Sequence, residues 1–104
     1  MASSKNYLDF VLEQLSGLEE IAHRQMMGEY IIYYRGKIAA YICDDRLLVK
    51  PIAAARAHMP DAPMETPYEG AKEMLLVENI DSRPFLEKLF RAMYDELPSP
   101  KKKK

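Results

Sequence analysis

Apolar positions recur at helical spacing near both ends of the chain. The first stripe follows the spacing i, i+3, i+4, i+7, i+8 and i+11, and it comprises Tyr7, Phe10, Val11, Gln14, Leu15 and Leu18, all apolar except Gln14. The second stripe comprises Leu86, Leu89, Phe90, Met93 and Leu97. Each stripe would lie along one face of a helix. Asp81 or Ser82 can cap the second helix, and Pro84 suits its first turn, where no backbone N–H is needed.

Between these stripes, β-branched and aromatic residues predominate and short turn signals interrupt them. This residue pattern predicts strands at 21–26, 29–35, 37–43 and 46–50. Gly36 separates the second strand from the third, and the polar pair Asp44-Asp45 suits a tight hairpin before the fourth. Apolar or small side chains occupy both faces of the strand at 37–43, which therefore should lie inside the sheet.

The rest of the chain completes an α-β-β-β-β-α-β-α order. Residues 52–59 are rich in alanine and predict a short helix, and residues 72–78 predict the last strand. Residues 60–70 hold three prolines and no period, which predicts a loop. The predicted fold class is α+β, a two-layer sandwich with an antiparallel sheet of about five strands and helices on one face. It would occupy residues 1–98, and residues 99–104 would form a disordered basic tail.

Charge and composition make some classes of function less probable than others for this chain. The chain has 104 residues and a net charge of −1, but Lys101–Lys104 carry four of its fifteen basic residues. The remainder has eleven basic and sixteen acidic side chains, a net of −5. An acidic body repels a phosphate backbone, so nucleic acid is expected to bind only weakly, through the tail. The polar N-terminus predicts no signal peptide, no apolar stretch could span a bilayer, and the expected location is the cytoplasm.

Residue types that carry chemistry are present, but their spacing predicts no catalytic, cofactor or metal site. His23 and His58 are far apart in the sequence, and Cys43 is the single cysteine, so no metal-binding pattern occurs. The carboxylates beside Cys43 would raise its pKa rather than activate it. Turn formation alone explains Asp44 and Asp45. Nucleotide-binding and serine-hydrolase motifs are absent, and we predict that the protein is not an enzyme.

Tyrosines concentrate on two of the predicted strands and allow two interpretations. They could form the core of the sheet with cross-strand aromatic pairs. Alternatively, they could form a half-exposed surface that binds a protein, with Met26 and Met27 adding adaptable contacts at its edge. On the second hypothesis, the surface residues are Met26, Met27, Tyr30, Ile32, Tyr34 and Tyr41. The partner would be an unknown protein or a second copy of the chain, joined by apolar burial and pairing of sheet edges.

A different class of function would use the predicted loop at 60–70. A pocket beneath this loop, with Lys50, Tyr68 and Glu69 at its rim, would make the protein a small-molecule binder or an enzyme. A deep pocket with convergent polar groups would favour this alternative, and a flat apolar face would favour the interaction module.

Several short motifs, taken in order, resemble the N-terminal domain of the TfoX (Sxy) family of competence regulators. They are Arg24-Gln25-Met26-Met27-Gly28, Tyr34-x-Gly36, Ile42-x-Asp44-Asp45-Arg46-Leu47-x-Val49-Lys50, Pro67-Tyr68 and Glu73-Met74. The resemblance covers almost the whole chain, from Asn6 to Leu97. It implies a fold similar to that of type III secretion chaperones and a part in bacterial transcription regulation. It implies no catalytic residues, and the regulators themselves carry a second domain that this sequence lacks.

Overall fold

The computed structural model describes residues 5–26, 29–67 and 70–97. Their order is α1 (Lys5–Gln14), β1 (Ile21–Met26), β2 (Glu29–Tyr34), β3 (Lys37–Cys43), β4 (Arg46–Val49), α2 (Ala53–His58), β5 (Met64–Glu65), β6 (Met74–Val77) and α3 (Arg83–Tyr94). The fold is α+β, as predicted. The predicted basic tail at 99–104 lies outside the described residues.

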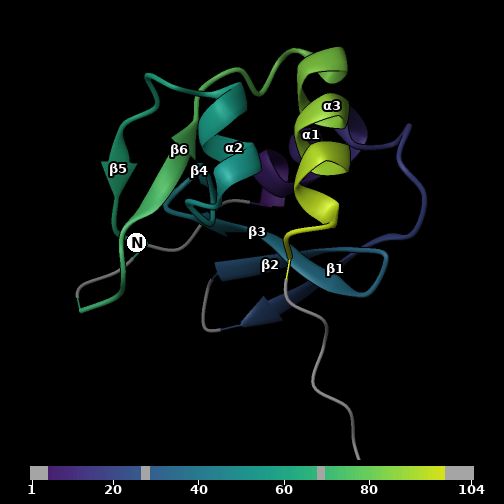
Figure 1. The fold of residues 1–104 in the computed structure, drawn as a ribbon. Coiled ribbons are helices and arrows are strands. Elements are labelled where there is room, and N and C mark those ends of the chain that lie inside the picture. Colours follow the sequence, from purple (N-terminus) through teal and green to yellow (C-terminus); the bar gives the residue numbers. More distant parts are fainter. Residues whose placement is uncertain (1–4, 27–28, 68–69, 98–104) are drawn as a thin grey trace, which may run out of the picture.

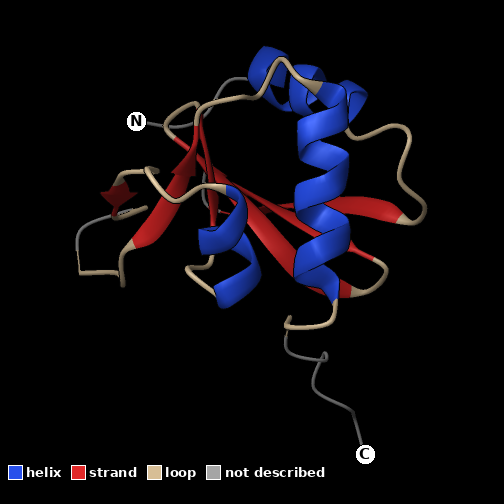
Figure 2. Ribbon diagram, turned by 45° about the horizontal axis from the view of Figure 1, so that its top comes forward, coloured by secondary structure: helices blue, strands red, loops and turns tan. Residues whose placement is uncertain are grey.

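One antiparallel sheet organises the molecule. Its six strands lie in the order β1-β2-β3-β4-β6-β5, so β3 is an interior strand as its two apolar faces predicted. The three helices gather on one side of this sheet (Figures 1 and 2). The prediction of about five strands omitted β5, which pairs with β6 through Met64 and Glu65 inside the segment predicted to be loop. A two-residue strand has no period of its own to recognise.

Two hairpins fix the register of the central strands. Arg35 and Gly36 join β2 to β3, and Asp44 and Asp45 join β3 to β4, all four with positive φ between 53° and 84°. Two successive residues with positive φ form the tight turn that matches the twist of the flanking strands. The turns that the sequence suggested at Gly36 and at the aspartate pair are therefore confirmed, and they align Cys43 with Arg46.

The main core lies between the sheet and the helices. All five residues of the predicted α3 stripe are buried there, and Ser82 caps α3 by accepting a hydrogen bond from the Phe85 N–H at 3.4 Å. The predicted stripe of α1 is rotated from the observed one, because Phe10 is 40% exposed whereas Leu8 is buried. Gln14 can lie in the buried stripe because its amide donates to the Ile80 carbonyl at 3.0 Å. Among the described residues, the helices are all too short or too polar to cross a membrane.

Candidate functional site

The helix-covered face of the sheet holds most of the residues predicted to bind a partner. Tyr30, Ile32 and Tyr34 alternate along β2, and their exposed fractions are 8%, 0% and 5%. Tyr34 packs against the rings of Phe90 and Tyr94 of α3, with centroids 6.2 and 5.4 Å away. These three side chains belong to the core, so their predicted place on an open face is wrong, and the core interpretation of the tyrosines holds for them.

Tyr41 lies on the other face of the sheet, which we call the second face. It pairs with Ile31 and with Leu48 across the neighbouring strands, and paired residues share a face. Tyr41 therefore cannot share one surface with Tyr30 and Tyr34, and the grouping predicted from the sequence is wrong. Met26 also points to the second face and is 50% exposed, while Met27 lies outside the described residues.

The second face carries a small apolar cluster under the segment that follows β5. Cys43, Leu48 and Met74 are buried there, and Tyr41 and Leu76 pack against them. None of the described helices covers this face (Figure 2), so other parts of the chain must exclude water from it. Pro67 is buried as well, which shows that the segment after β5 contributes to this cover.

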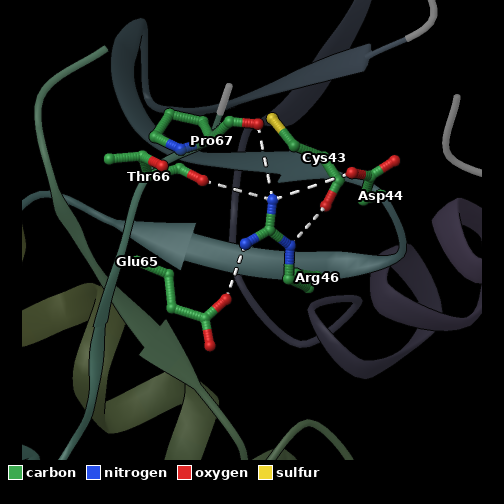
Figure 3. A network of polar contacts seen from close by, with 6 residues as sticks. All are labelled: Cys43, Asp44, Arg46, Glu65, Thr66 and Pro67. Carbon is green, nitrogen blue, oxygen red and sulfur yellow. Dashed lines mark hydrogen bonds and ion pairs between the residues drawn. The ribbon is translucent and has the colours of Figure 1, made fainter. Parts of the chain in front are cut away.

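Arg46 holds that segment in place through a network of polar contacts (Figure 3). Its guanidinium forms an ion pair with Glu65 at 2.6 Å and donates to the carbonyls of Thr66 at 3.3 Å and Pro67 at 3.4 Å. A further bond from Nε reaches the Cys43 carbonyl at 3.2 Å. The planar five-donor group of arginine suits such a fan of acceptors. Sequence reasoning missed this role, because Glu65, Thr66 and Pro67 lie 19 to 21 residues beyond Arg46 in the sequence.

Cys43 is packed away from solvent and its thiol is held in the neutral form. Burial raises the pKa of Cys43 to about 12, and the neighbouring Glu29 carboxylate contributes in the same direction. The side chain is 1% exposed. A nucleophilic cysteine needs an accessible thiolate, so this environment does not activate the thiol.

We expect Cys43 in the folded protein to react with the thiol reagent DTNB at pH 8 at least about 100-fold more slowly than in the urea-unfolded chain. The same pKa shift makes folding sensitive to alkali, because an ordinary thiol ionises near 9.0 whereas this one does so near 12. Between these two pH values the unfolded chain binds fewer protons than the folded protein, so the free energy of unfolding should fall as the pH rises. A fast reaction of the folded protein with DTNB would contradict the buried position of Cys43.

An open pocket of about 530 Å³ lies on the second face. It is lined by Tyr41, Lys50, Pro51, Ile52, Pro67, Ala71, Lys72, Glu73 and Met74. Lys50 lines this pocket, whereas Tyr68 and Glu69, the other two residues of the alternative hypothesis, lie outside the described residues. Sequence reasoning missed Lys72 and Glu73, which it placed on the last strand; β6 begins only at Met74.

The free edge of β1 is the other feature of the sheet that is open to a partner. Five of the six residues of this strand are exposed, and it pairs only with β2 among the described residues. The opposite end of the sheet is the two-residue strand β5. The long edge of the sheet is therefore that of β1, where Met26, Arg24 and Ala22 occupy the second face.

Metal ligands do not converge among the described residues. No group of three or more histidine, cysteine, aspartate or glutamate side chains in that part of the chain could hold an ion. His23 is exposed on β1 and stacks edge-on against Tyr30, and His58 is exposed on α2 with Nδ1 3.2 Å from the Ala54 carbonyl. The histidines thus lie in separate elements.

The comparisons with known proteins identify the family of this chain. Residues 13–92 match the model of the TfoX N-terminal domain. A curated relative, an uncharacterized 12.7 kDa protein in the trpE 5′ region of Spirochaeta aurantia, is 31% identical over 105 residues, which is 100% of this chain and 91% of that protein. No solved structure matches significantly. The chain belongs to the TfoX N-terminal domain family.

Proposed function

We propose that this domain is a protein-interaction module that binds its partner through the β1 end of the sheet. The observation that carries the proposal is the six-residue edge strand with five exposed residues. An unpaired strand edge offers a row of backbone donors and acceptors to which an extended segment of another chain can add. The contact surface is defined by the outer edge of β1 together with Arg24, Met26 and Tyr33.

Side chains beside this edge support binding on the second face. Ala22 and Arg24 of β1 lie opposite Tyr33 and Ile31 of β2, so they share that face. Met26 is 50% exposed at the end of the strand, and its unbranched side chain can adapt to a partner. Tyr33 is half-buried and presents an apolar ring with a polar tip. A strand of the partner would pair with β1 while its side chains contact this group.

We also propose which class of protein the partner belongs to. Because the family is named after competence regulators, we propose that the partner is a protein of the transcription apparatus and that the two proteins bind in the cytoplasm. A second copy of the chain is the alternative occupant of the same edge. The role would be binding without catalysis, since the one cysteine is buried with its thiol neutral and the histidines lie in separate elements.

We expect Met26→Glu to reduce retention of the partner about tenfold in a pull-down from extracts of the native cell, because it places a charge where an apolar contact forms. Phe10→Glu is the matched control. Phe10 is the other large exposed apolar side chain among the described residues, at 40%, and it lies on α1. Both variants should melt within a few degrees of the wild type, since both positions are solvated.

The molar mass in solution, measured by light scattering at several protein concentrations, distinguishes a second copy of the chain from a different protein as the partner. A mass that doubles with concentration in the wild type, and not in Met26→Glu, would identify a homodimer through β1. A monomer that retains one partner in the wild type and in Phe10→Glu, but loses it in Met26→Glu, would identify a different protein. Equal retention by all three chains would refute this surface.

A further inference from the structure

The pocket on the second face has the form of a small-molecule site. It is lined by Tyr41 of β3 and Met74 of β6, by the linker 50–52, by Pro67 and by the segment 71–73. Its volume of about 530 Å³ falls within the usual range of about 300–1,000 Å³ for ligand pockets. It includes no residue of β1, so it is separate from the proposed interaction surface.

Two arginines donate hydrogen bonds to backbone carbonyls of residues that line this pocket. Arg46 fixes Pro67 by donating to its carbonyl at 3.4 Å. Arg56 of α2 donates from Nε to the Pro51 carbonyl at 3.1 Å. Within the linker, the Ile52 N–H donates to the Lys50 carbonyl at 2.8 Å. A preformed pocket saves the entropy that a ligand would otherwise spend on ordering its site.

The lining combines apolar side chains with two lysines. Most lining side chains are apolar or aromatic, and the charged ones are Lys50, Lys72 and Glu73. Among the described residues, neither lysine side chain has a hydrogen bond or ion pair, whereas the Lys5 side chain pairs with Asp9 and that of Lys37 donates to the Tyr94 carbonyl. The pocket thus carries a net positive charge in a chain that is acidic apart from its lysine tail. Two ammonium groups that line one apolar pocket favour the binding of an anion.

We infer that this pocket binds a small amphipathic organic anion, a monocarboxylate with a flat aromatic or branched apolar body. The apolar body would lie against Tyr41 and Met74, where it removes apolar surface from water. The carboxylate would lie between Lys50 and Lys72, each of which can donate three hydrogen bonds. Glu73 repels additional negative charge, which selects a single carboxylate over phosphates or dicarboxylates.

The test uses 2-naphthoate as the probe and 2-naphthalenemethanol as its neutral counterpart. Titration of the isotope-labelled full chain with naphthoate should shift the amide resonances of Tyr41, Lys50 and Lys72, with a Kd below about 1 mM. The alcohol has the same ring system without the charge and should bind at least about fivefold more weakly, because it forms no ion pair. Absence of shifts at several millimolar naphthoate, or equal binding of the alcohol, would overturn the inference.

Charge-removing variants locate the site. Lys50→Gln and Lys72→Gln should each raise the Kd for naphthoate about three- to tenfold, the effect of one partly solvated ion pair. Lys88→Gln is the matched control, since Lys88 is an exposed lysine of α3 that does not line the pocket. Lys50→Arg keeps the charge and should keep most of the affinity, which distinguishes loss of charge from damage to the linker. Equal affinity in Lys50→Gln, Lys72→Gln and Lys88→Gln would refute binding at this pocket.

Discussion

Tyr34→Ala should destabilise the protein by about 3–5 kcal/mol, the usual cost of truncating a large buried aromatic side chain. Tyr34 is 5% exposed and fills the space between β2 and α3, where it meets the rings of Phe90 and Tyr94. Truncation would leave a cavity and remove the edge-to-face contact with Tyr94, whose ring lies at 71° to that of Tyr34. Urea unfolding followed by circular dichroism would measure the loss.

Tyr33→Ala is the control for this prediction, because Tyr33 is the preceding residue of the same strand and faces the other side of the sheet. It is half-buried, so its truncation should cost about 1 kcal/mol, near the centre of the range for single substitutions. Equal losses from the two variants would mean that the helices do not cover the Tyr34 side of β2. Tyr33→Ala should weaken partner binding, since Tyr33 belongs to the proposed surface.

Local sequence patterns predicted most of the helices, strands and turns, because each of these elements is determined mainly by residues close together in the sequence. The α3 stripe, a cap at Asp81 or Ser82 and the two-residue turn at Asp44 and Asp45 were all recognisable from spacing and residue type, and the structure assigns the cap to Ser82. The rotation of the α1 stripe was not, because Phe10 and Leu8 are both apolar and only the tertiary contacts decide which of them is buried.

The site was harder to predict, since it depends on which face of the sheet the helices cover. Alternation along β2 separates Tyr30, Ile32 and Tyr34 from Ile31 and Tyr33, but both sets are apolar and either could have faced the helices. The register shift between Ile32 and Tyr33 adds a further change of alignment with β3. Lys50 was named from the sequence only as a rim residue of a pocket under the loop at 60–70, whereas Lys72 required the three-dimensional path of the segment before β6.

Arg46→Gln should cost about 2–3 kcal/mol, roughly the contribution of charge-assisted hydrogen bonds lost from one partly buried group. The side chain of Arg46 is 26% exposed and contacts Glu65, Thr66, Pro67 and Cys43. Without the guanidinium, the segment after β5 loses its attachment to β4. The backbone amide of Leu76, which donates to the Pro63 carbonyl at 2.9 Å, should then exchange with solvent faster.

Arg83→Gln provides the contrast for this prediction, because Arg83 also joins distant segments but is more exposed than Arg46. Its Nε donates to the Oε1 of the buried Gln14 at a long distance, 3.4 Å. The side chain of Arg83 is 49% exposed, and it pairs with Glu13, which is 71% exposed. An ion pair of this kind contributes about 0–1 kcal/mol.

Arg46→Lys keeps the charge but cannot reach several acceptors at once, so it should recover only part of the stability. Equal unfolding free energies for Arg46→Gln and Arg83→Gln, with unchanged amide exchange at Leu76, would show that the segment after β5 is held by burial of Pro67 instead. If the attachment through Arg46 is the cause, Arg46→Gln should also weaken naphthoate binding, because Pro67 lines that pocket.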